Sequence, residues 1–321
     1  MKSCWIRTHN GKVALEVQDI PVPQPKPDEI LLRVHCTSLN RGEFLAQYQA
    51  DGVRPGGGEA AGEVHAVGAG VTGIKRGDRI MGRAKGGFAE YALLDALQAI
   101  PVPERLTWEQ AAAVPLVFLV TYDMLYPYGK LKAGEWLLVT AASSGVGVAC
   151  IQTGKYLGAK VIGTSGSAEK LAKLKAIGLD VGIQTRSADF AAQVKSVTDG
   201  KGANLVVNNV GGSVFAECVR ALAYQGRLAT VSSMDGVTKS EIDLEALHAY
   251  RLELFGVSNR YTSAAQRAQT VRGFVRDLLP AFAEGRIAPV VDKVFAFDEL
   301  PAARNYMESN SQVGKIVVRV A

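Results

Sequence analysis

Residues 136–147, WLLVTAASSGVG, join an apolar run to a turn built from small residues and glycines. The run over 136–140 predicts a buried strand, and residues 145–157 after the turn predict a helix. Small residues let the backbone approach a ligand, and the free N–H groups at a helix start can bind a phosphate. The stretch therefore predicts a dinucleotide-binding loop, with a ligand-free tight turn as the alternative, because only the last glycine of GxGxxG is present, at Gly147.

Downstream of this loop, apolar strands and helical segments alternate along the chain. Strands are predicted at 160–163, 181–184, 205–208, 226–231 and 252–257, and helices at 168–177, 189–198 and 214–222. This alternation is typical of a parallel sheet covered on both faces. We therefore expect an α/β protein with a Rossmann doubly wound parallel-sheet domain over residues 119–259, followed by one long helix over 265–284.

Upstream of the loop, the first 110 or so residues contain short apolar runs separated by glycine and proline turns. Four prolines within residues 21–27 predict an extended connection, because proline fits neither a helix interior nor a central strand. Many short strands of this kind predict a partly open β-barrel. The C-terminal segment is short for an independent domain, so we expect residues 1–118 and 260–321 to form one domain together.

Composition excludes several classes of protein. The 321 residues carry 36 Lys and Arg against 31 Asp and Glu. The sequence contains no run of five like charges, so we expect no charged tail that binds nucleic acid. No apolar stretch reaches the ~20 residues that span a bilayer, and residues 111–120 read as a buried helix. The N-terminus lacks the apolar core of a signal peptide. We expect a cytoplasmic protein without a membrane segment.

Cysteine and histidine spacing bears on metals and disulfides. The four cysteines and four histidines form no CxxC, HxH or HxxxH pair. A structural zinc site built from local cysteine pairs is therefore excluded, and we expect reduced, buried thiols.

The end of the second predicted strand indicates the type of cofactor. A carboxylate there would bind a ribose 2′-hydroxyl, but hydroxyl side chains, a glycine and a lysine occur instead, which favours NADPH. Lys170 has the alternative of a solvated charge on a helix face. Because ligands bind at the carboxyl ends of parallel strands, we also expect the loops after the fourth and fifth strands to contribute. The predicted cofactor-binding residues are Ser144, Gly145, Val146, Gly147, Ser165, Gly166, Ser167, Lys170, Asn209, Val210, Gly211, Ser232 and Ser233.

A second motif begins with Gly57, Gly58 and Glu59. It continues with Gly62, Gly68 and Val71 and ends with Gly77, Asp78, Arg79 and Ile80. It resembles the signature GHExxGxxxxxGxxVxxxxxGDxV of the medium-chain dehydrogenase/reductase family at every spacing. The resemblance extends to the loop at 142–147 and to Gly314 with the following residues. It implies a GroES-like β domain formed by both chain ends, with a Rossmann domain inserted between them.

Two departures from the family pattern concern the catalytic zinc. The zinc-ligand histidine of the alcohol dehydrogenases corresponds to Gly58, and their first zinc-ligand cysteine corresponds to Asn40. The chain therefore resembles the zinc-independent quinone oxidoreductase branch, and the resemblance implies no metal. A tyrosine that often helps to bind the 2′-phosphate corresponds to Thr185, which is followed by Arg186, so Arg186 joins the predicted cofactor-binding residues.

The resemblance implies hydride transfer from NADPH to a quinone or an α,β-unsaturated carbonyl compound. It places Asn40 against the nicotinamide as the catalytic candidate, with a turn-forming asparagine as the alternative. Arg41 and Tyr48 are weaker substrate-contacting candidates, for which ordinary surface residues are the alternative. Glu59 is the family's acid beside the former zinc site, and a structural hydrogen-bond acceptor is its other interpretation.

Other functions stay open at this point. An enoyl-thioester or 2-alkenal reductase is the alternative within the enzyme class, and an NADPH-binding structural or RNA-binding protein is the alternative outside it. Nucleic-acid binding is not expected, because no basic stripe with interleaved aromatic residues occurs. The resemblance also implies a homodimer formed through the edge strand over 252–257.

Overall fold

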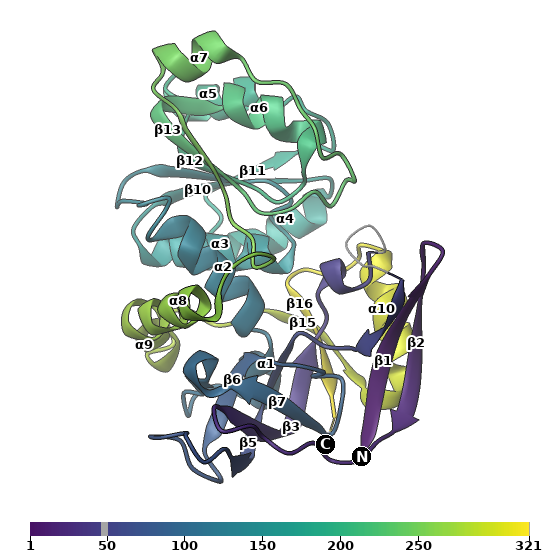
Figure 1. Ribbon diagram of the computed structural model, residues 1–321. Helices are drawn as coiled ribbons and strands as arrows, with labels where there is room; N and C mark the ends of the chain where they lie inside the picture. Colours follow the sequence, from purple (N-terminus) through teal and green to yellow (C-terminus); the bar gives the residue numbers. More distant parts are fainter. Residues whose placement is uncertain (46–50, 321) are drawn as a thin grey trace. The chain divides into compact units, whose positions relative to one another are not determined.

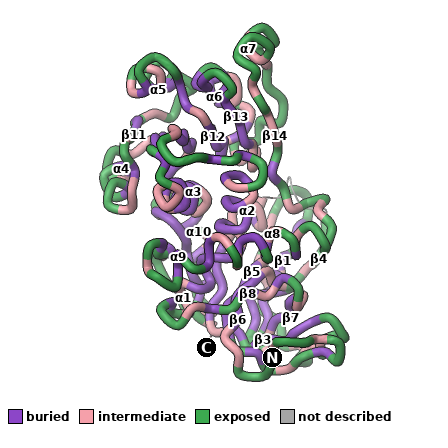
Figure 2. Tube along the Cα trace, turned by 90° about the vertical axis from the view of Figure 1, so that its left-hand side faces the viewer, coloured by how far each residue is buried: buried purple, intermediate pink, exposed green. Residues whose placement is uncertain are grey.

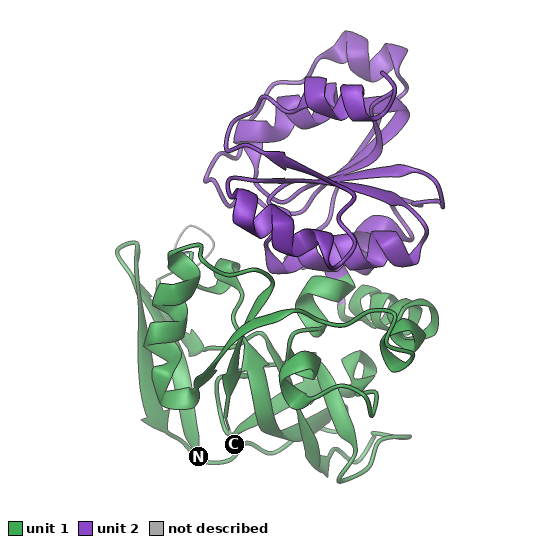
Figure 3. Cartoon of the chain, turned by 180° about the vertical axis from the view of Figure 1, so that it is seen from behind, with its two compact units in different colours: residues 1–119, 264–321 green, residues 120–263 purple. Residues whose placement is uncertain are grey.

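The computed structural model describes residues 1–45 and 51–320, which form two compact units (Figure 3). Unit 1 contains residues 1–119 and 264–321, and unit 2 contains residues 120–263. The chain thus leaves unit 1, forms the whole of unit 2, and returns to finish unit 1.

Unit 2 is built on a six-stranded parallel sheet. The strands lie in the order β11-β10-β9-β12-β13-β14, which is the Rossmann order, and each neighbouring pair is parallel. Their bounds are β9 Trp136–Val139, β10 Lys160–Ser165, β11 Val181–Gln184, β12 Ala203–Asn208, β13 Leu222–Thr230 and β14 Glu253–Gly256. The central strands carry buried aliphatic residues toward both layers of helices, which confirms the predicted doubly wound fold.

Helices cover both faces of this sheet, with α3 and α4 on one side and α5 and α6 on the other (Figure 1). Their bounds are α3 Gly145–Tyr156, α4 Ala168–Lys175, α5 Ala191–Val197, α6 Phe215–Arg220 and α7 Leu244–Ala249. The prediction of a helix over 214–222 was wrong at its end. α6 ends at Arg220, and β13 begins at the buried residue Leu222. The prediction missed this boundary because no glycine or proline separates the helix from the strand.

Unit 1 contains a seven-stranded sheet and a three-stranded sheet among its described residues. The larger has the order β15-β16-β3-β5-β6-β8, with β7 paired to β3, and the smaller has the order β2-β1-β4. Their bounds are β1 Lys2–His9, β2 Lys12–Asp19, β3 Glu29–Ser38, β4 Gly52–Pro55, β5 Glu59–Val67, β6 Arg79–Arg83, β7 Tyr91–Asp95, β8 Ile100–Pro101, β15 Val291–Ala296 and β16 Lys315–Arg319. Buried residues follow the strands at the centre of the larger sheet, β3, β5 and β6 (Figure 2), whereas β2 and β4 contain none.

The pairing of β16 with β3 shows why the chain end belongs to this unit. The two strands are antiparallel, with Val317 opposite Ser38 and Arg319 opposite Cys36. Strand β3 also pairs with β5, which begins at Glu59. Residues from three distant parts of the sequence are therefore brought to one end of the sheet.

Two helices that the sequence predicts as continuous are each divided near a proline. The helix expected over 111–120 is interrupted, because α1 Trp108–Ala112 ends before Pro115, which begins α2 Pro115–Leu125. The long helix expected over 265–284 is divided into α8 Ala264–Asp277 and α9 Leu279–Ala283, and Pro280 lies in the first turn of α9. Helix α10 Leu300–Glu308 precedes β16. A search of the described residues found no helix with both the length and the apolar character needed to cross a membrane.

Candidate functional site

The glycine loop of unit 2 has the geometry of a phosphate-binding turn. Ser144 caps α3, and its Oγ accepts a hydrogen bond from the Gly147 N–H at 3.0 Å. A Cβ at Gly147 would lie 2.5 Å from the carbonyl oxygen of Ala142, so only glycine permits this close packing of helix against turn. Ala141 holds a left-handed backbone with φ of 47°, an unusual conformation for alanine that the tight turn imposes.

A second turn, between β10 and α4, collects the residues predicted to recognise a 2′-phosphate. Ser167 caps α4 through the Lys170 N–H at 3.3 Å, and the Ser165 Oγ accepts from the Ser167 N–H. The side chain of Arg186 packs on Gly166, because a Cβ there would lie 2.4 Å from the Arg186 Nε. The structure thus gathers two hydroxyl groups and a guanidinium around one turn, a donor set that suits a phosphate.

The loops after β12 and β13 supply the third part of this site. The Asn208 Oδ1 accepts from the N–H groups of Val210 and Gly211, at 3.0 and 3.1 Å, and so fixes the loop. The Ser232 Oγ donates to the carbonyl of Asn209 at 3.0 Å. The Oδ1 of Asn209 is buried and accepts no hydrogen bond within the described residues. A buried acceptor of this kind needs a donor, which a bound ligand can provide.

Together these loops lie at the carboxyl ends of five neighbouring strands, β11, β10, β9, β12 and β13. The predicted residues brought to this edge are Ser144, Gly145, Val146, Gly147, Ser165, Gly166, Ser167, Lys170, Arg186, Asn209, Val210, Gly211, Ser232 and Ser233. The close turn at Gly147, the donors beside Gly166 and the orphaned acceptor of Asn209 all fit a dinucleotide with an additional phosphate.

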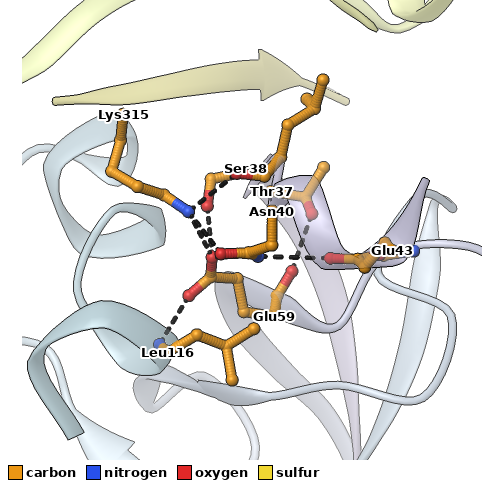
Figure 4. A network of polar contacts seen from close by, with 9 residues as sticks. Thr37, Ser38, Asn40, Glu43, Glu59, Leu116 and Lys315 are labelled. Atoms are coloured by element: carbon orange, nitrogen blue, oxygen red, sulfur yellow. Dashed lines mark hydrogen bonds and ion pairs between the residues drawn. The ribbon is translucent and has the colours of Figure 1, made fainter. Parts of the chain in front are cut away.

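Unit 1 contains a buried polar network centred on Glu59, shown in Figure 4. The Glu59 side chain is fully buried, and its Oε1 accepts from the Ser38 Oγ, from the Asn40 Nδ2 at 2.7 Å and from the Lys315 Nζ at 2.9 Å. Its Oε2 accepts from the backbone N–H of Leu116 at 2.7 Å. This dense set of donors agrees with a structural role for Glu59, because a buried carboxylate requires a cation and hydrogen bonds.

Asn40 is held on every polar side by this network. Its Nδ2 donates to Glu59 and, at 3.2 Å, to the Oε1 of Glu43, and its Oδ1 accepts from the Lys315 Nζ at 2.8 Å. The orientation of the amide is therefore defined by charged partners. Both of its N–H groups already have protein acceptors, which leaves one lone pair of Oδ1 for any further contact.

Glu43 was missed by the sequence reasoning. It lies in a short 3₁₀ turn, Arg41–Glu43, three residues after Asn40, and this spacing on one turn was the available signal. Its Oε2 accepts from the Gly57 N–H at 3.0 Å. Burial raises the pKa of the Glu43 carboxyl, the Asn40 hydrogen bond lowers it, and the nearby Glu59 charge raises it further.

An open pocket of about 300 Å³ borders Glu43, Arg54, Gly57, Gly58 and Lys85. Gly58 stands next to the carboxyl, since a Cβ there would lie 3.3 Å from the Glu43 Oε1. The missing side chain at position 58 therefore leaves space beside the acid.

The two predicted substrate-contacting residues have different outcomes. The Arg41 guanidinium donates to the carbonyl of Met307 at 2.6 Å and to the Oδ1 of Asn310 at 2.8 Å, so it ties the 3₁₀ turn to the end of α10. Tyr48 lies outside the described residues. Over residues 1–45 and 51–320, no three His, Cys, Asp or Glu side chains are grouped as metal ligands.

Comparison with known proteins adds to this geometry. The family model for the alcohol dehydrogenase GroES-like domain matches residues 26–104, and that for zinc-binding dehydrogenase matches residues 145–274. A mycobacterial protein solved in complex with NADPH is 28% identical, with a TM-score of 0.90, and a structure titled mycobacterial quinone oxidoreductase is 30% identical, with a TM-score of 0.85. In both cases each chain is covered completely.

A curated relative is much longer than this chain. A component of the phenolphthiocerol/phthiocerol polyketide synthase of Mycobacterium tuberculosis is 29% identical over 96% of this chain. The matched region makes up only 14% of that synthase polypeptide, so the chain corresponds to a small part of it.

Proposed function

Because the chain belongs to the medium-chain dehydrogenase/reductase family of oxidoreductases, we propose that it reduces a quinone or an α,β-unsaturated carbonyl compound with NADPH, without a catalytic zinc. The observation that carries this proposal is the donor set around Gly58. Position 58 has no side chain, and the Asn40 amide is committed to Glu43, Glu59 and Lys315. Among the described residues around position 58, Glu43 and Glu59 are the ones of a zinc-ligand type, and Glu59 is already paired with Lys315. Such a set falls short of the three thiolate, imidazole or carboxylate ligands of a catalytic zinc site.

The residues at the carboxyl edge of unit 2 account for the proposed cofactor. The N–H groups at the start of α3 would bind the pyrophosphate, and Ser165, Ser167 and Arg186 would bind the 2′-phosphate. The buried Oδ1 of Asn209 would accept a hydrogen bond from the cofactor. When bound, NADPH supplies a hydride, and the protein supplies position and electrostatics.

Asn40, which the resemblance places against the nicotinamide as the catalytic candidate, has the task of a positioning residue in this proposal. Its amide is fixed by Lys315 and Glu59, so it acts on the reaction by holding the Glu43 carboxyl in one orientation. Conjugated acceptors need less activation of the carbonyl group than simple ketones do, which is consistent with a site that lacks a Lewis acid.

An enoyl-thioester or 2-alkenal reductase is the second candidate. It is supported by the likeness to a segment of a polyketide synthase. A homodimer formed through the edge strand β14 belongs to the same proposal and rests on the family resemblance alone. A cytoplasmic location is proposed from the apolar pattern of the sequence.

Initial rates of NADPH and NADH oxidation test the proposal. The acceptors are 1,4-benzoquinone, 9,10-phenanthrenequinone, 2-hexenal and a crotonyl thioester, each with and without a metal chelator. We expect turnover that prefers NADPH and is unaffected by the chelator. Chelator-sensitive turnover would contradict the zinc-free mechanism, and tight NADPH binding without turnover would support a binding protein instead.

A further inference from the structure

We propose that Glu43 is the proton donor of this reductase and delivers a proton from its carboxyl to the reduced substrate in the pocket beside Gly58. The inference rests on the proposed function and assigns the half of the reaction that the cofactor does not supply. Three kinds of observation carry it: the access of the carboxyl to the pocket, the nature of its hydrogen-bond partners, and its burial.

Access follows from the two glycines at the pocket wall. The Glu43 carboxyl contacts the Gly57 N–H, and the bare backbone of Gly58 leaves the space beside Oε1 open. A side chain at position 58 would occupy that space, because even its Cβ would lie 3.3 Å from both the Glu43 Oε1 and the Leu116 Cδ1. A substrate oxygen or carbon can therefore approach this acid.

The hydrogen-bond partners hold the carboxyl but do not neutralise it. Within residues 1–45 and 51–320, the side-chain hydrogen bonds of Glu43 come from the Asn40 amide and from the backbone at Gly57 and Gly58. The neighbouring Glu59 instead receives the Lys315 ammonium directly, at 2.9 Å. Neutral donors stabilise a carboxylate less than a contacting cation does, so Glu43 is the carboxyl of the pair that retains a proton more readily.

Burial outweighs the mixed charges around Glu43. Burial is the largest influence on the pKa of Glu43 and raises it, and the Glu59 carboxylate adds to that effect, while the Asn40 hydrogen bond and Lys315 oppose it. The charges of Arg54 and Arg83 also attract the Glu43 carboxylate, although the Arg54 guanidinium directs its hydrogen bond to the backbone carbonyl of Glu43, at 2.6 Å. Lys85 is paired with Glu29.

The chemistry balances with one proton. Hydride addition to the β-carbon of an enone forms a C–H bond and shifts the π electrons to the carbonyl oxygen, which leaves an enolate. The Glu43 O–H bond then breaks, and its proton completes the saturated ketone or aldehyde by way of the enol. NADPH is oxidised to NADP⁺, and the Glu43 carboxylate recovers a proton from water through the open pocket. A quinone acceptor yields the hydroquinone by the same count.

Glu43→Gln is the central test, because glutamine keeps the length of the side chain and one acceptor oxygen, which can still accept from the Asn40 amide, but it cannot donate an acidic proton. General acid catalysis contributes typically 10²- to 10⁴-fold, so we expect kcat with 2-hexenal to fall by at least about 100-fold. The loss with 1,4-benzoquinone should be much smaller, because a hydroquinone anion is a far weaker base than an enolate and water can protonate it. Glu43→Asp should recover part of the enal activity, and the partly buried Glu109→Gln, which leaves the pocket intact, should lose none.

Two further readouts separate a proton donor from a structural residue. Infrared difference spectra of the free protein over a pH series should show a protonated carboxyl band that persists to higher pH than that of an ordinary glutamate and that Glu43→Gln removes, and NADPH affinity should change by less than about threefold. In the wild type, kcat for 2-hexenal should fall as the pH rises through the Glu43 pKa, and the variant should lack this limb.

The outcomes distinguish this inference from the proposed function. A wild type that reduces 2-hexenal while Glu43→Gln retains kcat within threefold overturns the proton donor alone, as does a Glu43 carboxyl that titrates at or below the pH of an ordinary glutamate. A wild type that reduces no acceptor at all overturns the proposed function and this inference with it. An equal loss with enal and quinone overturns the inference as well, because it indicates a damaged site rather than a missing proton.

Discussion

Replacing Lys315 with methionine tests the buried network most directly. Lys315 lies on β16 and is about 5% exposed, and its Nζ contacts the Glu59 Oε1, the Asn40 Oδ1 and the carbonyl of Leu39, each within 2.9 Å. Methionine keeps the length of the side chain but removes the charge and all three donated hydrogen bonds. Glu59 then stays fully buried with no contacting cation.

The expected cost follows from that burial. Removing one partner of a buried ion pair costs about 3–5 kcal/mol, because the remaining charge is left uncompensated. The three neutral donors that stay on Glu59, from Ser38, Asn40 and Leu116, favour the lower end of this range. A domain is stable by about 5–15 kcal/mol, so the Lys315→Met protein should fold but unfold at clearly lower urea concentration.

Urea unfolding followed by tryptophan fluorescence and circular dichroism measures this loss. Two tryptophans, Trp5 and Trp108, lie in unit 1 and Trp136 lies in unit 2, so the transition of unit 1 can be followed even if the units unfold separately. Lys155→Met is the matched control, since its pair with Asp180 is about one-third exposed and should contribute about 1 kcal/mol or less.

A double variant isolates the role of charge. Glu59→Gln combined with Lys315→Met removes both charges and should recover a large part of the lost stability. If Lys315→Met costs less than about 1 kcal/mol, or if the double variant is no better than the single one, the reasoning from buried charge is refuted.

Three further predictions concern the cofactor turn, the acid and the thiols. Arg186→Gln should weaken NADPH binding by about 10- to 100-fold and leave NADH binding unchanged, because a charged hydrogen bond contributes about 1.5–3 kcal/mol. Gly166→Ala should also weaken NADPH binding, because the added Cβ would displace Arg186. Fluorescence titration measures both affinities, and equal losses for NADPH and NADH would contradict this prediction. Because burial raises the folded-state pKa of Glu43 above its unfolded value of about 4.3, the folded state loses stability as pH rises between the two values. Glu43→Gln should therefore gain stability relative to the wild type over that window, by at most about 1.4 kcal/mol per pH unit, and denaturant titrations at pH 4 to 8 that show a constant difference would contradict this. Burial raises the pKa of Cys36 and of Cys150 to about 12, so a disulfide reagent at pH 8 should label few thiols in the native protein and all four after unfolding; rapid native labelling would show that these sites are open.

The sequence was a good guide to unit 2 because its elements are local. Each strand and helix lies within one short window, and the glycine loop carries its own turn residues. The errors fell where no punctuation residue separates neighbouring elements, as between Arg220 and Leu222, or where a proline inside an apolar run divides a helix, as at Pro115 and Pro280. In these places periodicity alone cannot locate a boundary.

Arg186 could be singled out by resemblance, but its contact with Gly166 is a consequence of strand pairing. β10 and β11 are parallel, with Ser165 opposite Gln184, so the residues just after each strand face one another. The glycine at 166 then gives the arginine side chain room to lie across the turn. Such a contact depends on register, which a single sequence specifies only weakly.

The network of unit 1 was the least predictable part. Asn40 and Lys315 are 275 positions apart, and they meet only because β16 pairs with β3. Sequence reasoning could single out Asn40 and Glu59 by resemblance. It could not show that Lys315 forms its ion pair with Glu59 and not with Glu43. That distinction depends on which side chain reaches which oxygen.

This distinction gives the site its chemical asymmetry. Glu43 and Glu59 both accept a hydrogen bond from the Asn40 amide. Of these two carboxyls, only that of Glu59 contacts an ammonium group of the described residues. Environments that differ in this way divide a pair of carboxyls into a charged member and an acidic member. In a relative with histidine at position 58, the side chain would fill the space next to Glu43, whereas glycine opens that space to a substrate. Glycine at position 58 therefore does more than withhold a metal ligand, because it leaves space beside the Glu43 carboxyl.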